Sequence, residues 1–150
     1  MIRNCACGEM LTLELRTIMY RHQVQILHVP VLVCNVCNHY ELIGAVKSEI
    51  KDLMQQLGTN PEPRKLSFTT VSELSQLIYE VFTQYADSTE NVDEKVEEAI
   101  DERINMLLDL YSYASSVDDQ DWMDQLTTRL ATLSAVNRHE CCIYGNFHEK

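Results

Sequence analysis

Cys5-Ala6-Cys7 and Cys34-Asn35-Val36-Cys37 are the stretches that decide the fold, because each places two thiols close together in the chain. The 26 residues between them read as two strands of alternating apolar and polar side chains joined by a polar turn. Such a hairpin carries one thiol pair to the other, and thiolates are the ligands that zinc prefers. The pattern predicts one structural zinc ion held by four sulfurs, those of Cys5, Cys7, Cys34 and Cys37.

Other interpretations of the thiols stay open. Free cysteines pack well in a protein interior without any metal. Six cysteines in a secreted chain would instead pair as disulfides, but the start Met1-Ile2-Arg3-Asn4 lacks the pattern of a signal peptide, so we expect a cytoplasmic, reducing location. A catalytic zinc would need an open position, with His22, His28 or His39 replacing one thiol. With four cysteines present, we expect these histidines to be ordinary surface or strand residues.

The apolar pattern predicts an α+β protein, in which a small zinc-ribbon-like β-hairpin plus one helix is followed by an all-α three-helix bundle. Strands are expected over 11–16 and 24–33, with Pro30 at a sheet edge or a bulge. Apolar residues at helical spacing follow from Ala45 and stop at Gly58. A capping box at Thr70–Glu73, a similar start at Asn91–Glu94 and acids at 118–121 mark the three later helices.

Composition divides the chain into parts. Residues 59–65 contain two prolines and no large apolar side chain, so we expect a four-cysteine domain over 1–58 and a linker over 59–68. An acidic helical domain over 69–138 and a tail over 139–150 complete the chain. The tail holds His139, Cys141, Cys142 and His148, which leaves a second metal site as an open alternative.

Charge narrows the class of partner. Residues 1–65 carry a net charge of +1, whereas residues 66–150 carry −12. Such an acidic part repels phosphate backbones and attracts basic proteins, so we expect a protein partner and no nucleic acid. The most apolar run, Val29 to Cys34, is far too short to cross a bilayer, so no membrane contact is expected. A surplus of apolar residues from Ile104 to Tyr113 also favours a homodimer as an alternative.

Residues 3–58 resemble the YgiT-type zinc finger, the N-terminal domain of MqsA-like antitoxins. The resemblance rests on Cys5, Cys7-Gly8, the strand pair, Val29-Pro30, and Cys34-x-x-Cys37 followed by a helix. It implies that the four cysteines are zinc ligands, although the family usually has CxxC where this chain has CxC. It also implies an antitoxin or transcriptional regulator with a helix-turn-helix domain. The acidic second half shows no basic recognition helix of that kind.

Acidic residues crowd the start of the second bundle helix, at Glu90, Asp93, Glu94, Glu97, Glu98, Asp101 and Glu102. They are similar to the carboxylates of helical nucleotide pyrophosphohydrolases, which implies a magnesium-dependent enzyme as one alternative. A solvated helix start that meets a basic partner is the other. Residues 100–130, around Asp119-Gln120-Asp121-Trp122-Met123, are similar to the IDEAL domain, a short helical interaction module. The alternative there is a tryptophan that anchors the bundle core.

Together these features predict a non-enzymatic, cytoplasmic zinc-binding regulator or adaptor. It would act through protein-protein contacts of its acidic helical domain. The residues expected to bind the partner are Glu94, Glu97, Glu98, Asp101 and Trp122.

Overall fold

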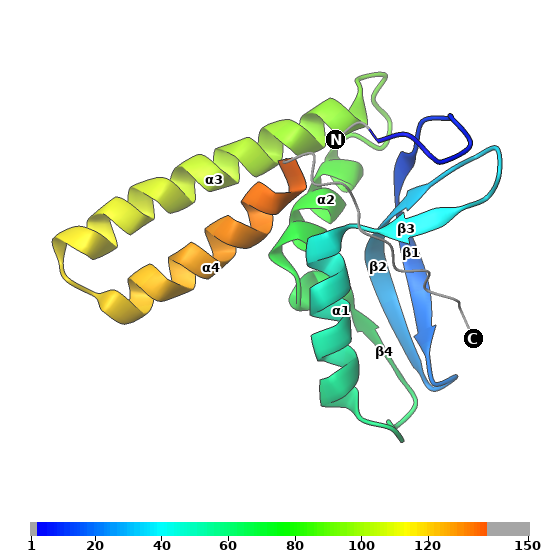
Figure 1. The fold of residues 1–150 in the computed structure, drawn as a ribbon, viewed down its shortest axis with the longest axis horizontal. Coiled ribbons are helices and arrows are strands. Elements are labelled where there is room, and N and C mark those ends of the chain that lie inside the picture. The colour runs from blue at the N-terminus through cyan, green and yellow to red at the C-terminus, as the bar shows by residue number, and fades with distance from the viewer. Residues whose placement is uncertain (1–2, 138–150) are drawn as a thin grey trace.

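The computed structural model describes residues 3–137 and confirms the α+β class (Figure 1). A β-hairpin and its neighbouring strands come first, and the long helices follow. In chain order the elements are β1 (Thr12–Tyr20), β2 (Val24–Val33), β3 (Tyr40–Leu42), α1 (Gly44–Leu57), β4 (Arg64–Ser67), the 3-10 helix η1 (Phe68–Thr70), α2 (Glu73–Gln84), α3 (Val92–Ser116) and α4 (Gln120–Asn137).

Strand β2 is the centre of the sheet. It pairs antiparallel with β1 along most of its length, while β3 pairs with residues 31–33 and β4 with residues 24–27. Pro30 lies opposite Leu15 of β1, in the short stretch of β2 between its pairings with β3 and β4, so among the described strands it is paired on one side only. A bulge does occur close by: the β1–β2 register shifts between Arg16 and Ile18, and His28 has a φ of 61°.

Strand β4 lies inside the range expected to be a linker. It runs parallel to β2, and the amide of Arg64 donates to the carbonyl of Gln23 at 3.1 Å. The prolines at 61 and 63 precede the strand, so they leave its ladder bonds intact. The connection from β2 to β4 includes α1, which buries Val46, Ile50 and Leu53 along one face and ends at Gly58, as predicted.

The starts of the helices follow the predicted chemistry in two of three cases. Asn91 caps α3 by accepting from the amides of Asp93 and Glu94, and Asp119 accepts from the amide of Trp122 at the start of α4. The capping box expected at Thr70 is wrong, because Ser72 caps α2 and accepts from the amide of Ser75. Thr70 belongs to η1 instead, and its hydroxyl donates to the carbonyl of Ser67.

A seryl hydroxyl fastens α2 to the sheet. Ser75 is fully buried, and its Oγ donates to the carbonyl of His28 at 2.7 Å. This carbonyl belongs to the bulge of β2, between the stretches that β3 and β4 occupy, and no strand of the described chain is paired with it there. The hydroxyl therefore satisfies a backbone acceptor that the bulge would otherwise leave buried without a partner.

Helices α3 and α4 form an antiparallel hairpin that extends away from the sheet (Figure 1). Helices α1 and α2 lie between this hairpin and the sheet. Buried side chains from β2, α1, α2, α3 and α4 join in one apolar core. The division into a domain over 1–58 and another over 69–138 stays a prediction.

Candidate metal centre

The two thiol pairs lie in turns of the same design. In the first, the amide of Cys5 donates to the carbonyl of Glu9 at 2.7 Å, and the amide of Gly8 donates to the carbonyl of Cys5 at 2.9 Å. In the second, the amide of Cys34 donates to the carbonyl of His39 at 2.7 Å, and the amide of Asn38 donates to the carbonyl of Cys34 at 3.0 Å. The first turn is one residue shorter, which accounts for CxC in place of CxxC.

The residue that follows the second thiol of each turn has a positive φ, 95° at Gly8 and 59° at Asn38. Glycine adopts this region without steric cost, and asparagine is one of the few other residues that tolerate it. The sequence after each thiol pair therefore suits a tight loop that folds back on itself. An isolated bridge between Asn4 and Met10 closes the first loop, and β3 begins directly after the second.

The four sulfurs converge at the end of the hairpin. All of them lie within 4.8 Å of one another, and the Cys5–Cys37 and Cys7–Cys34 sulfur pairs are each 3.5 Å apart. A zinc ion with bonds of about 2.3 Å would space its sulfur ligands about 3.8 Å apart at the corners of a tetrahedron. The cysteines are free, with Cys5 and Cys34 buried and Cys7 and Cys37 exposed. This group of ligands can hold one metal ion.

Backbone amides favour negative charge on these sulfurs. Amide donors at Cys37 and Val36 lower the pKa of the Cys34 thiol to about 6. The amides of Cys7 and Glu9 act in the same direction on the pKa values of Cys5 and Cys7, but burial and the adjacent sulfurs outweigh them and leave both pKa values raised. A cation among the sulfurs would relieve this crowding, because it stabilises every thiolate at once.

Two of the three histidines considered as replacement ligands, His28 and His39, have other contacts. The ring of His28 lies 2.9 Å from the hydroxyl of Ser67 and is tilted against Tyr79, with ring centroids 4.6 Å apart. The ring of His39 lies 3.9 Å from the carboxylate of Glu41. Within residues 3–137, Cys5, Cys7, Cys34 and Cys37 are the only group of histidine, cysteine and acidic side chains gathered closely enough for an ion. The acids at the start of α3 are not gathered in that way.

The residues expected to bind a partner do not form one patch. Glu94, Glu97, Glu98 and Asp101 lie in the first half of α3, where Glu98 forms an ion pair with Lys95. Trp122 begins α4 at the other end of the hairpin, with its ring centroid 6.0 Å from that of Tyr113. Twelve residues of helix separate Asp101 from Tyr113, which corresponds to about 18 Å. Trp122 is partly buried and packs against the core, which fits the alternative of a tryptophan that anchors the bundle.

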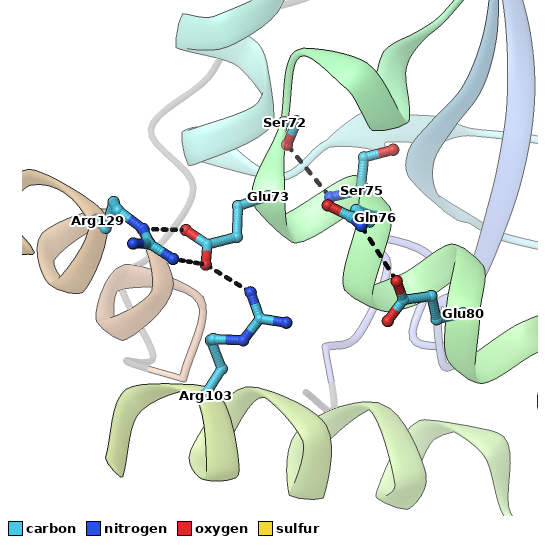
Figure 2. Close-up of polar contacts among 7 residues, drawn as sticks. All are labelled: Ser72, Glu73, Ser75, Gln76, Glu80, Arg103 and Arg129. Atoms are coloured by element: carbon cyan, nitrogen blue, oxygen red, sulfur yellow. Dashed lines mark hydrogen bonds and ion pairs between the residues drawn. The ribbon is translucent and has the colours of Figure 1, made fainter. Parts of the chain in front are cut away.

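A charged cluster that the sequence analysis missed joins three helices (Figure 2). The carboxylate of Glu73 accepts from Arg129 at 2.6 and 2.9 Å and from Arg103 at 2.7 Å. Arg129 and then Arg103 hold the pKa of Glu73 below its ordinary value, against the opposing effect of burial. Arg103 is the one arginine of α3 and Arg129 is the one arginine of α4. Neither lies within a helical turn of Glu73 in the sequence, so no residue spacing predicts their contact with it.

The Cys/His-rich tail from His139 to His148 lies outside the described residues. Among residues 3–137 no helix has both the length and the apolar character that a transmembrane helix needs. The structure shows a four-cysteine cluster that could bind a metal, together with a β-hairpin and the helices that follow it. The resemblance to the YgiT-type finger stays a prediction. Comparison of the chain with protein-family models, curated proteins and solved structures finds no match.

Proposed function

We propose that the chain is a non-enzymatic, zinc-binding regulator or adaptor that acts through protein-protein contacts of its acidic helices. The observation that carries the metal part is the convergence of four free sulfurs within 4.8 Å. Four thiolates complete the tetrahedral coordination of zinc and leave no position for water or substrate. Zinc in such a site stabilises the fold and does not take part in a reaction.

The geometry of the two loops that carry the cysteines, which we call the thiol tip, supports a structural role for the ion. Residues 6–10 and 35–40, which form the loops that carry the thiols, are exposed. They therefore bury little apolar surface of their own, and short segments of this kind depend on a cross-link to hold one conformation. Zinc would supply that cross-link by joining the loop before β1 to the turn between β2 and β3.

The contact surface is assigned to the acidic half of the chain. The carboxylates of Glu94 and Glu98 are exposed on the first turns of α3, and Glu97 and Asp101 belong to the same stretch of helix. A net charge of −12 over residues 66–150 steers a basic protein toward these helices and disfavours DNA or RNA. A partner with a basic surface is therefore the proposed target.

The test uses the full chain, because β4 pairs with β2 and a cut between the two predicted parts would damage the sheet. The tagged chain is captured from the cell that makes it, and bound proteins are identified by mass spectrometry. One abundant partner should be retained, and it should be lost when Glu94, Glu97, Glu98 and Asp101 are changed to lysine. A control with Asp52→Lys and Glu62→Lys, at exposed sites in the first half, should keep it. Equal retention by both variants would contradict this surface, and recovery of nucleic acid in place of protein would contradict the proposed class.

A further inference from the structure

The end of the helical hairpin carries an apolar surface that, within residues 3–137, is partly exposed. It is made by Met106, Leu110 and Tyr113 of α3, by Val117, which caps the end of α3, and by Trp122 of α4, and we call it the distal surface. Leu110 and Trp122 are partly buried, because they also pack against the core. Met106, Tyr113 and Val117 are 45%, 60% and 52% exposed. Met106, Leu110 and Tyr113 recur at spacings of four and three, so they share one face of α3, and Val117 follows four residues later at the helix end. The ring contact of Tyr113 with Trp122 extends that face onto α4.

The distal surface continues an interface that already exists in the fold. Glu73, the first residue of α2, binds Arg103 of α3 and Arg129 of α4, and α2 packs along α3 only on the sheet side of this point (Figure 2). Leu110 lies seven residues after Arg103, and Trp122 lies seven residues before Arg129. A spacing of seven is two helical turns and returns to the same face. Near the sheet, α2 covers one side of the α3–α4 hairpin. The distal surface is on that same side, at the end of the α3–α4 hairpin that lies away from the sheet.

The charge around this surface has a single sign. Residues 104–128 contain five acids, Asp109, Asp118, Asp119, Asp121 and Asp124, and no lysine or arginine. Asp109 lies on α3 between Met106 and Tyr113, and Asp121 and Asp124 stand on either side of Trp122 in the sequence. An apolar strip with an acidic border is complementary to a helix that has an apolar face and basic flanks.

We propose that the distal surface binds a basic amphipathic helix of a partner protein, which lies on α3 and α4 where α2 ends. The proposal rests on the function proposed above and names the shape and charge of the partner element. A second copy of the chain is a poorer occupant, since it would bring a second set of five acids against the first. Hydrophobic contact supplies the affinity, and the acids orient the helix and exclude acidic sequences.

The test uses the full chain and a synthetic helix of about 14 residues, which spans four turns. The probe is a leucine–lysine peptide with leucines at spacings of three and four, so that they share one face. One control peptide has the same composition with leucines out of register, and another has glutamate in place of lysine. Trp122 is the only tryptophan of the chain, so its fluorescence reports binding at this surface directly. Anisotropy of a labelled peptide gives the affinity.

The key variant is Met106→Gln with Val117→Gln, which removes two exposed apolar side chains from the surface. The matched control is Leu108→Gln. Leu108 is also exposed on α3, at 49%. Because it follows Met106 by two residues, its side chain points to nearly the opposite side of the helix. Circular dichroism checks that each variant is folded. Asp109→Lys separately tests the acidic border.

The in-register peptide should shift the emission of Trp122. Its affinity should fall about tenfold or more in the double variant, stay unchanged in Leu108→Gln and fall in Asp109→Lys. Equal binding of both leucine–lysine peptides, or equal loss in Leu108→Gln, would overturn the proposal in favour of unspecific charge attraction. A chain that is dimeric alone and becomes monomeric in the double variant would overturn it in favour of a second copy. If the native partner is still captured in either case, the proposed function stands and only this surface fails.

Discussion

The four-thiol tip and the helical hairpin of α3 and α4 are held by different forces. At the tip, exposed loops surround the sulfurs, and Cys5 and Cys34 are themselves part of what little is buried there. In the hairpin, Ile100, Leu107, Leu126 and Leu133 are fully buried, and Glu73 cross-links both helices to α2. One region depends on a ligand and the other on packing, so perturbations should act on them separately.

Removal of the metal should have the largest effect. Structural zinc contributes on the order of 10 kcal/mol in small zinc-dependent folds, because the ion replaces an apolar core. A chelator, or Cys34→Ser, should raise amide hydrogen exchange in the two thiol loops, residues 3–11 and 34–42, and leave α3 and α4 protected. Val36→Ser, an exposed change between the thiols of the second turn, is the control and should change little. Loss of protection along the whole chain would mean that the two regions are not separable.

The next effect is expected in the hairpin. Glu73→Gln removes the carboxylate that binds Arg103 and Arg129, and we expect a loss of about 2 kcal/mol in the free energy of unfolding. The expected value is modest because Arg129 is 41% exposed and can be hydrated instead. Chemical denaturation gives the measurement, with Glu80→Gln on the exposed face of α2 as control. The thiol tip should keep its metal in both variants.

The same carboxylate should give a pH signature. Because its folded-state pKa is lowered, Glu73 contributes stability that is complete above its unfolded pKa of about 4.3 and is lost as the pH falls through the lower folded value. Burial raises the pKa of Glu49, so the effect of Glu49 on stability changes with pH in the opposite direction. The difference in unfolding free energy between wild type and Glu73→Gln therefore isolates the contribution of Glu73. That difference should shrink as the pH is lowered from 6 toward 3. A constant difference would contradict the ion-pair account.

A smaller loss is expected where the sheet meets α2. Ser75→Ala leaves the carbonyl of His28 buried without a donor and should cost about 1 to 2 kcal/mol. Ser112→Ala, on the exposed side of α3, serves as control. An unchanged midpoint of denaturation would show that the bulge finds another donor.

The smallest effect is expected at a helix cap. Asn91→Ala removes the side chain that accepts from the amides of Asp93 and Glu94 and should cost about 1 kcal/mol. Asn105→Ala, an exposed position in the middle of the same helix, should be neutral or slightly stabilising. Thermal unfolding of the two variants makes the comparison, and equal melting temperatures would contradict the cap.

Local patterns predicted much of this structure. The thiol spacings indicated the ligand group because each pair lies within one turn. Alternation of apolar and polar residues indicated β1 and β2 because successive side chains of a strand point to opposite faces, although the second half of β2 is buried on both faces. The cap of α2 was misplaced because Thr70 and Ser72 both lie near the helix start, and only the chain path selects between them.

Features that depend on distant segments escaped prediction. Strand β4 pairs with residues about 40 positions earlier, and Arg129 lies 56 positions from Glu73. No periodicity within one helix encodes such pairs. The acids of α3 and Trp122 were grouped by type, whereas the helical rise places them far apart.

Native mass spectrometry of the full chain, purified without added metal, shows directly whether the four sulfurs hold zinc. We expect one zinc ion per chain, lost in Cys34→Ser and retained in Val36→Ser. The ion should also be retained when Cys141 and Cys142 of the tail are both changed to serine. A folded chain without metal, a different metal, or zinc that survives Cys34→Ser would contradict the proposed zinc site.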